Sequence, residues 1–472
     1  MKQLILLLML FAGTLRAQSD TEFGLRDTLY SEILKEKRSF LVYIPKNENP
    51  YIQSETYPVL YLLDGDKLFL QTVGIVAHLS SPYGAKKCPK MIIVGIDQND
   101  READLLPKSA ANTDLFTQFL QKELVPYIEK QYPAKPYRTL MGHSLGGLRA
   151  VNTVLYHPET FHAYLVLDPS LGHDLNVWSD KAHDMMQEKS FGNQSLYLAM
   201  AQTMPMGMDT AAIRADKGGM SRHMRAIMRF ADDAAACSGL RFYWKYFPNE
   251  THGSSTFLGT YDGLKALFDW YDYAALESIY TEKVTEEQAL KLLDIHYSKV
   301  SENMGFKVLP SESEVDQMIQ LLLAKGMKSK AIAFAELNAK NYPKSSYAAL
   351  FLNFLQWSDK KLLSELLEKM SAKEIYRLCQ SEAKKTDPEY NISEMGINDF
   401  AYLLLKADRN TDALLFFELN VEIFPNAWNT YDGYGECLLK LGRKKEGLAA
   451  YKKSLELNPK NEKAADLLMR NR

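Results

Sequence analysis

The spacing of hydrophobic positions divides the chain at about residue 275. Before that point, short apolar runs alternate with segments of helical spacing. The run at 91–96 (MIIVGI) is apolar throughout, as in a strand covered on both faces. The pattern predicts strands over 39–44, 57–63, 91–96, 137–141, 163–167, 195–200 and 240–246, and helices over 115–132, 148–156, 221–236 and 261–271. Strands that alternate with helices indicate crossover units and a mainly parallel sheet, which is the α/β class.

After residue 276 the strand signals stop, and the chain reads as successive helices rich in Leu, Lys, Glu and Ala. Pro425 and Pro459 each follow a predicted helix, and the interval between them is the period of paired helices that is typical of tetratricopeptide repeats. The last unit has the repeat's order of large and small residues at Tyr431, Gly435, Gly442, Tyr451, Ser454 and Pro459.

Two earlier segments match the tetratricopeptide pattern of large and small residues less completely. One has equivalent residues at Ala401, Ala413, Phe417 and Pro425, and the other at Gly326, Ala331 and Pro343. The spacing from Pro343 to Pro425 is not a whole number of such periods, so the array is irregular between them. We expect 276–310 to be a helical connector and 311–472 to form an all-α, tetratricopeptide-like helical domain.

Residues 1–17 have the layout of a signal peptide. Lys2 supplies a positive charge, residues 4–12 form an uninterrupted apolar run, and small residues precede a cleavage point after Ala17. An apolar run of this length is too short to span a bilayer. We therefore expect residues 1–17 to be removed, the mature protein to be periplasmic or secreted, and its first domain to span 18–275.

Composition narrows the class of protein. Hydrophobic residues make up 46% and charged residues 24% of the 472 residues, which excludes a disordered chain, a collagen-like chain and a multi-span membrane protein. The net charge of −3 carries no basic excess, so nucleic acid is not expected as the main partner. The four cysteines, Cys88, Cys237, Cys379 and Cys437, match no metal-binding spacing, and we expect buried free thiols.

The candidate chemistry starts at residues 142–147 (GHSLGG). This Gly-x-Ser-x-Gly segment follows a predicted strand and precedes a predicted helix. A serine in such a sharp turn has a strained backbone that only small neighbours allow, and its hydroxyl stands clear of the sheet. Ser144 is therefore the predicted nucleophile.

A nucleophilic serine needs a base, and this arrangement has the chain order serine, acid, histidine. Of the nine histidines, His252 lies in the loop after the last predicted strand and before the closing helix, where the base is needed. For the acid we expect Asp209, the first carboxylate after the strand 195–200. The alternatives are Glu250, Asp216 and Asp168, and a Ser–His dyad without a carboxylate stays open.

The oxyanion of such a reaction needs backbone N–H donors. We expect one from Leu145, directly after the nucleophile. The other is expected from Asp66, in the turn after the strand 57–63, where Gly65 permits the bend. The alternative is an Asp-Gly turn with no chemical role.

Several separated motifs over roughly residues 25–275 resemble the esterase D, or putative esterase, family. The resemblance is carried by 61–66 (YLLDGD), 93–97 (IVGID) with Arg101 and Pro107 after it, 141–147 (MGHSLGG), 156–161 (YHPETF), 168–171 (DPSL) and His252-Gly253. It implies the α/β-hydrolase fold and an ester-cleaving activity, in a family that includes siderophore, feruloyl and acetyl-xylan esterases, S-formylglutathione hydrolases and mycolyltransferases. The chain is also similar to exported esterases that carry C-terminal tetratricopeptide repeats.

One departure from the family concerns Gly172 and His173, which stand where relatives often carry aromatic residues. The resemblance also implies that a Ser–His dyad can suffice, because siderophore esterases of this type can work with one.

Together these features predict an exported serine ester hydrolase that works through an acyl-enzyme and needs no cofactor or metal. The expected substrate is a siderophore ester or a feruloyl or acetyl polysaccharide ester, and the repeats would bind a protein partner. The alternative is a partner-binding repeat protein in which the hydrolase domain serves only as a scaffold.

Overall fold

The computed structural model describes residues 20–21, 24–46, 49, 52, 55–107, 114–173, 177–188, 191–203, 208–357, 359–459 and 461–470. The expected signal peptide, residues 1–17, lies outside the described residues. The chain divides into two compact units, Met1–Leu321 and Leu322–Arg472. The division falls inside helix α12 (Glu312–Ala324), so the expected connector, 276–310, belongs to the first unit.

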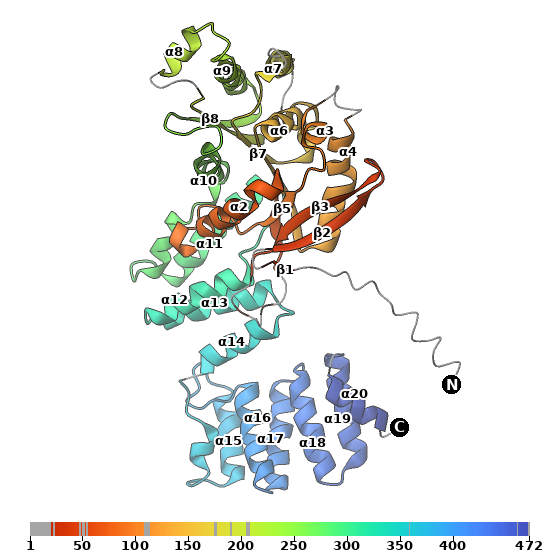
Figure 1. Cartoon of the computed structure of the whole chain (residues 1–472). Helices are drawn as coiled ribbons and strands as arrows, with labels where there is room; N and C mark the ends of the chain where they lie inside the picture. The colour runs from red at the N-terminus through yellow and green to blue at the C-terminus, as the bar shows by residue number, and fades with distance from the viewer. Residues whose placement is uncertain are drawn as a thin grey trace, which may run out of the picture. The chain divides into compact units, whose positions relative to one another are not determined.

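In the described part of the chain, the first unit is built on one nine-stranded sheet (Figure 1). Its strands are β1 (Asp20–Thr21), β2 (Gly24–Ser31), β3 (Glu36–Tyr43), β4 (Tyr57–Leu63), β5 (Ile92–Ile96), β6 (Ala134–His143), β7 (Ala163–Leu167), β8 (Gln194–Ala201) and β9 (Leu240–Phe247). Their order across the sheet is β1-β2-β3-β5-β4-β6-β7-β8-β9. The strands from β5 to β9 in this order are parallel, and β1, β2 and β3 are antiparallel at one edge.

The central strands form because their sequences are apolar runs that can be covered on both faces. Every residue of β4, β5 and β7 is buried. Helices α2 and α10 pack on one face of the sheet, and α5, α6 and α9 pack on the other. This mostly parallel sheet between helices confirms the predicted α/β-hydrolase fold. It also aligns the carboxyl ends of β4, β6, β7 and β8 along one edge.

The α-helices of the first unit connect these strands and then continue beyond the sheet. They are α2 (Gly65–Leu79), α3 (Arg101–Leu105), α4 (Leu115–Phe119), α5 (Val125–Gln131), α6 (Leu145–Tyr156), α7 (Val177–Glu188), α8 (Thr210–Ala215), α9 (Arg222–Ala236), α10 (Ser255–Leu267), α11 (Glu286–Met304) and the part of α12 up to Leu321. A π-helical turn, Leu120–Leu124, joins α4 to α5, so the single helix expected over 115–132 is interrupted.

A largely buried carboxylate, that of Glu314, fixes the start of α12 to the rest of the first unit. Glu314 Oε1 accepts hydrogen bonds from the hydroxyls of Tyr273 (2.8 Å) and Tyr271 (3.2 Å), and Oε2 accepts one from Tyr297 (2.5 Å). Burial alone would raise the pKa of Glu314, but Lys86, at 3.9 Å, and the tyrosine hydroxyls lower it to about 2. The glutamate therefore ties α12 to α11 and to the segment after α10.

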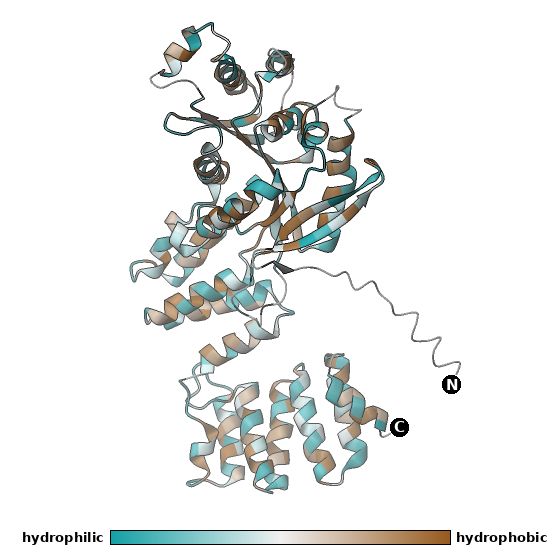
Figure 2. Cartoon of the chain, viewed as in Figure 1, coloured by the Kyte–Doolittle hydropathy of each residue, from teal (hydrophilic) through white to brown (hydrophobic). Residues whose placement is uncertain are grey.

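The longer elements described in the second unit are α-helices. It contains α13 (Lys328–Asn341), α14 (Ser346–Trp357), α15 (Ala372–Glu382), α16 (Glu394–Lys406), α17 (Asn410–Ile423), α18 (Trp428–Lys440), α19 (Lys444–Leu457) and α20 (Glu462–Arg470). Figure 2 shows apolar and polar residues sharing each of these helices, as expected where one side packs against neighbours. A helical region after the α/β domain was predicted, and it is confirmed.

Two helix pairs of this unit repeat at a fixed interval. Both ends of α16 recur as the ends of α18 (394 to 428, 406 to 440), and both ends of α17 recur at the same interval as the ends of α19 (410 to 444, 423 to 457). This is also the interval from Pro425 to Pro459. The period noticed in the sequence is therefore a period of structure in this stretch.

Two further properties concern the whole chain. The four cysteines are free thiols, and Cys88, Cys379 and Cys437 are buried. Among the described residues, no helix combines the length and the apolar character needed to cross a bilayer.

Candidate active site

The turn between β6 and α6 holds Ser144 in a conformation that side chains rarely adopt. Its φ is 59° and its ψ is −117°. The turn closes because Gly142 has no side chain, since a Cβ there would lie 2.2 Å from the carbonyl oxygen of Gly146. The N–H of Ser144 donates to the carbonyl of Leu167 at the end of β7 (3.1 Å). The serine is thus held at the carboxyl edge of the sheet, as expected for a nucleophile turn.

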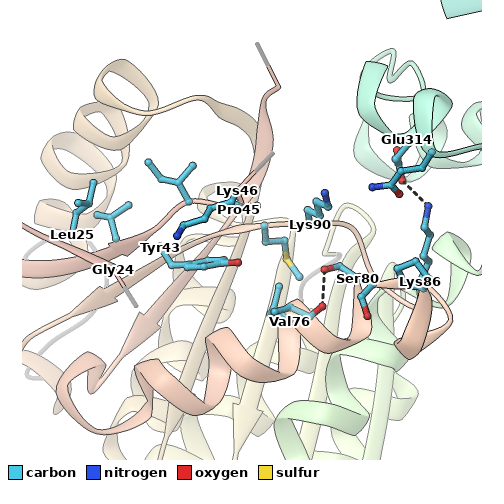
Figure 3. Close-up of a pocket in the computed structure, with 17 residues that line it drawn as sticks. Gly24, Leu25, Tyr43, Pro45, Lys46, Val76, Ser80, Lys86, Lys90 and Glu314 are labelled. Atoms are coloured by element: carbon cyan, nitrogen blue, oxygen red, sulfur yellow. Dashed lines mark hydrogen bonds and ion pairs between the residues drawn. The ribbon is translucent and has the colours of Figure 1, made fainter. Parts of the chain in front are cut away.

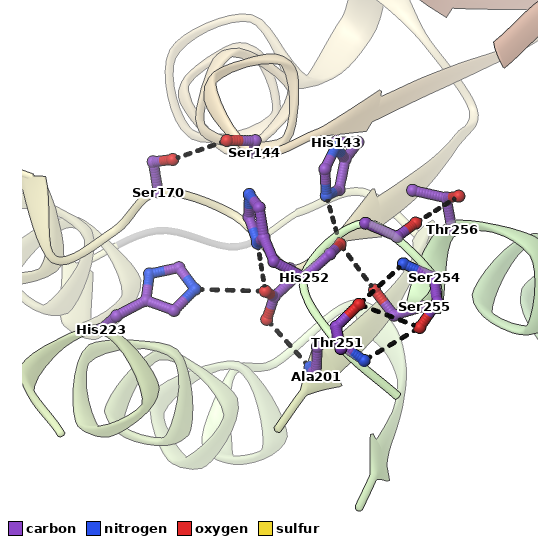
Figure 4. A network of polar contacts seen from close by, with 12 residues as sticks. His143, Ser144, Ser170, Ala201, His223, Thr251, His252, Ser254, Ser255 and Thr256 are labelled. Carbon is purple, nitrogen blue, oxygen red and sulfur yellow. Dashed lines mark hydrogen bonds and ion pairs between the residues drawn. The ribbon is translucent and has the colours of Figure 1, made fainter. Parts of the chain in front are cut away.

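The Ser144 hydroxyl lies at the N-terminus of α6, which begins at Leu145. Its Oγ is 3.2 Å from the hydroxyl of Ser170, in the loop after β7 (Figure 4). Because the first N–H groups of a helix have no partner within that helix, the Leu145 N–H can serve an anion beside Ser144.

His252 lies between β9 and α10, and its ring contacts a carboxylate. The Nδ1 atom is 2.5 Å from Oδ2 of Asp168. Figure 4 shows the other ring nitrogen turned toward the Ser144 side chain. With Nδ1–H donating to the carboxylate, Nε2 carries the lone pair that faces the serine. The ring is therefore oriented as a base.

Asp168 follows β7 and is fully buried. Its Oδ1 accepts the N–H of Ala201 at the end of β8 (2.9 Å), and its Oδ2 also accepts from Nε2 of His223 (3.3 Å). Burial alone would raise the pKa of Asp168, but the two histidines and the Ala201 N–H lower it to about 2. The carboxylate is therefore ionised and fixed in position.

The carboxylate that contacts His252 in the structure is thus that of Asp168, one of the alternatives, and not that of Asp209. Asp209 caps α8, and its side chain accepts the N–H of Ala212 (2.8 Å). Asp216 lies just after the same helix and accepts the N–H of Gly218 (3.1 Å). The position follows from topology: β7 and β8 are parallel neighbours, so a residue just after β7 can reach the end of β8 and the histidine loop together.

His143 is a site residue that the sequence did not indicate. Its Nε2 is 2.8 Å from the carbonyl oxygen of His252, and the two rings lie with centroids 4.4 Å apart. Burial and the neighbouring His252 lower the pKa of His143 to about 4, so the ring is neutral at neutral pH and donates to that carbonyl. The middle residue of the Gly-His-Ser segment therefore fixes the His252 loop.

The turn after β4 lies against the turn that carries Ser144. Asp64 has φ 55°, and its carboxylate is held by Arg101 through two hydrogen bonds (2.6 and 2.9 Å). A Cβ on Gly146 would lie 3.4 Å from Oδ2 of Asp64, so the two turns touch. Asp66 is in the first turn of α2, where helix N–H groups lack partners within the helix. Leu145 and Asp66, the two expected donors, thus lie in the first turns of two helices, α6 and α2, whose starting turns touch.

The Asp168, His223 and His252 side chains also offer metal-ligand atoms within 4.8 Å of one another. Both imidazoles, however, hydrogen-bond to the same carboxylate oxygen. The arrangement is that of a carboxylate that orients histidines.

Figure 3 shows a cavity of about 740 Å³ whose lining includes Lys90 and Met91, just before β5, so it lies at the amino ends of the parallel strands. It is lined by the end of β3, the residues just before β5 and the last turn of α2, with Tyr43, Lys90 and Val76 among them. Ser144, His252 and Asp168 lie at the carboxyl edge and are not among the residues that line this cavity.

The first unit is similar to known esterases and hydrolases. The family model described as "Putative esterase" matches residues 31–255. The crystal structure of an IroE-like serine hydrolase from Shewanella oneidensis is 30% identical, covers 67% of this chain and 98% of its own, and superposes with a TM-score of 0.53.

Two curated relatives match a smaller part. The ferri-bacillibactin esterase BesA of Bacillus subtilis is 27% identical over 160 residues, which are 29% of this chain and 55% of that protein. The siderophore triacetylfusarinine C esterase of Aspergillus fumigatus is 26% identical over 137 residues, 24% of this chain and 44% of that one. The chain thus spans about half the length of the curated relatives it matches.

Proposed function

We propose that this chain, which belongs to the putative esterase family, is a carboxylic ester hydrolase that forms an acyl-enzyme on Ser144. One observation carries the proposal: His252 lies between Ser144 and the buried Asp168 at the carboxyl edge of the sheet, with Nδ1 bound to the carboxylate and the other nitrogen facing the serine.

In the first half of the reaction, Nε2 of His252 takes the proton of Ser144 while Oγ attacks the ester carbonyl. The N–H groups of Leu145 and Asp66 stabilise the oxyanion of the tetrahedral intermediate. The imidazolium is stabilised by ionised Asp168, and it then gives its proton to the leaving alcohol.

In the second half, water attacks the acyl-enzyme. His252 accepts the proton of the water and returns it to Ser144 Oγ when the acid leaves. In the structure, Ser144 Oγ lies near the hydroxyl of Ser170. The proposed proton transfer therefore requires Oγ to turn from that hydroxyl toward His252 when substrate binds.

For the substrate we propose a siderophore ester, which agrees with the names of two curated relatives, one a ferri-bacillibactin esterase and one a triacetylfusarinine C esterase. A feruloyl or acetyl polysaccharide ester is the second candidate. Both are esters with an acyl carbonyl that the same serine could attack, so a direct comparison of rates decides between them.

The first test is hydrolysis of short-chain p-nitrophenyl esters by the purified protein, beside Ser144→Ala and His252→Ala. Each substitution is expected to lower kcat by about 10⁴-fold or more, because each removes a group that acts on the reacting atoms. Labelling of Ser144 by a fluorophosphonate, located by peptide mass spectrometry, checks the nucleophile without a substrate. A wild type that neither hydrolyses the esters nor takes the label would contradict the proposal.

Hydrolysis of a trilactone siderophore and of feruloylated xylan, measured in parallel, then tests the substrate. A higher kcat/KM on the trilactone supports the siderophore ester. The reverse order would replace it with the polysaccharide ester.

We further propose that the protein is exported after cleavage at Ala17, and that the second unit is a tetratricopeptide-like array that binds a protein partner. The signal-peptide layout of residues 1–17 supports the first, and the recurrence of a helix pair at a fixed interval supports the second. The mass of the mature N-terminus in each cell fraction tests export.

A further inference from the structure

The carboxylate of Asp168 binds two imidazoles, and the mechanism above uses only one of them. His252 Nδ1 and His223 Nε2 lie 2.5 and 3.3 Å from the same oxygen, Oδ2. Figure 4 shows the two rings meeting at this carboxylate from different sides. His223 belongs to α9, which has no other part in the proposed reaction.

The position of His223 is built into the packing of the loop after β7. A Cβ on Gly172 would lie 3.0 Å from Cα of His223 and 3.3 Å from its backbone nitrogen. Without that side chain, the loop that carries Asp168 packs directly on the first turn of α9. Ser221, just before the helix, is fully buried, so this end of α9 is anchored. The second imidazole is therefore held against Asp168 by close backbone packing.

We propose that His223 is a positioning residue that takes up part of the negative charge of Asp168 Oδ2, and thereby keeps His252 neutral and able to accept a proton at lower pH than Asp168 alone would allow. The inference rests on the proposed function, because it assigns His223 a role in tuning the base of that reaction.

The direction of the effect follows from electrostatics. An ionised carboxylate beside a histidine favours the imidazolium, and each extra donor on the same oxygen weakens that preference. A neutral His223 donates its N–H to Oδ2, and a protonated His223 would also repel a charged His252. Both states of His223 therefore favour the neutral form of His252.

The other titratable groups around His252 do not reverse the direction of this effect on its protonation. Among the described residues, the titratable side chains in ring or hydrogen-bond contact with its ring are His143 at the end of β6, Asp168 after β7 and His223 on α9. Of these three, Asp168 is the one that can carry negative charge, and its pKa of about 2 keeps it ionised across the working range. The hydrogen bond from His223 is one of the causes of that low pKa.

The test compares two substitutions at His223. His223→Phe keeps an aromatic ring but removes the donor, whereas His223→Gln keeps an N–H donor of similar reach. We expect His223→Phe to move the midpoint of the acid limb of kcat/KM upward by about 0.5 to 1 pH unit, and His223→Gln to stay near wild type. His183→Phe is the matched control, since it removes another His–Asp pair, between α7 and α9 (2.9 Å to Asp233).

A second readout does not depend on turnover. The pKa of His252 is followed by NMR in protein with labelled histidine, in a Ser144→Ala background, with and without His223→Phe. If the protein proves not to be an esterase, this titration still tests the effect of His223 on His252. His223→Leu replaces His223→Phe if thermal unfolding shows that the latter is not folded.

The inference is overturned if the titration of His252 in the donor-free variant superimposes on that of the parent. It is also overturned if His223→Gln shifts the acid limb as far as His223→Phe, or if the donor-free variant loses activity equally at every pH. The last result would mean that His223 serves only to pack α9.

Discussion

Asp168 shows at the scale of the residue what decides the choice of acid. Asp209 comes after β8 in the chain and was the expected partner of His252, yet its carboxylate is used to cap α8. Asp168 is next to the last residue of β7, fully buried, and bound to the histidine. A capping aspartate is exposed and local, whereas an orienting carboxylate must be buried and fixed from several strands.

Exchanging these two carboxylates for amides separates the two roles. We expect Asp168→Asn to lower kcat/KM by about 10²- to 10⁴-fold, because an amide no longer stabilises the imidazolium and can favour the wrong tautomer. Asp209→Asn is the matched control and should keep wild-type kinetics, with a change in the free energy of unfolding of less than about 1 kcal/mol. Steady-state kinetics on a p-nitrophenyl ester checks both. Equal losses of kcat/KM in the two variants would mean that Asp209 also acts in the active site.

The residues that sequence reasoning could find are those whose role is local. Ser144 was predictable because its neighbours at Gly142 and Gly146 are set by the turn itself. His252 was predictable from its place between the last strand and the closing helix. Asp168 and His223 were not chosen, because their contact joins β7, β8 and α9, and no spacing along the chain reports that meeting.

At the scale of the element, the apolar runs predicted the buried strands well, and the edge of the sheet less well. β4 and β7 match their predicted ranges, since a strand covered on both faces is apolar throughout. β2 was not predicted, because it is an edge ribbon in which partly buried positions dominate. Helix α2 was also missed, although the turn that starts it carries the expected oxyanion donor Asp66.

The turn that carries Ser144 has no room for a side chain at Gly142. We expect Gly142→Ala to lower the free energy of unfolding by about 3 kcal/mol or more, because its Cβ would meet the backbone of Gly146 at 2.2 Å. Gly253→Ala is the control in the neighbouring loop, where a Cβ has nothing within 4 Å. Urea unfolding of both variants measures the difference. A Gly142→Ala protein of wild-type stability would mean that the turn relaxes around the added methyl group.

At the scale of the whole molecule, Glu314 makes some of the contacts that tie α11 and α12 to the rest of the first unit. Burial of Glu314 among tyrosine hydroxyls, with Lys86 nearby, leaves its pKa at about 2 against an ordinary 4.5. A carboxylate whose pKa is lowered on folding stabilises the protein fully above pH 4.5, and this contribution is lost as pH falls toward 2.

We therefore expect Glu314→Gln to lower the free energy of unfolding by about 2 to 3 kcal/mol at neutral pH. The difference in the free energy of unfolding between variant and wild type should become smaller between about pH 4.5 and 2, because Glu314 of the wild type is protonated there. Urea unfolding at several pH values measures it, with Glu302→Gln, an exposed glutamate on α11, as control. A difference in the free energy of unfolding that does not change with pH would mean that Glu314→Gln destabilises the protein through packing and not through loss of the charge.

The recurrence of α16–α17 as α18–α19 has a consequence for how this protein can change in length. Successive copies of such a pair meet their neighbours through the same kind of interface, so adding or removing one copy creates no new type of contact. A duplication of one period within this stretch would leave every turn and packing face in register, whereas a gain of a few residues would not. Chains descended from a common ancestor of this protein are therefore expected to differ in length here by whole multiples of that period. The number of residues between Ser144 and His252 is set instead by the strands and helices of the sheet domain, and it does not follow the period.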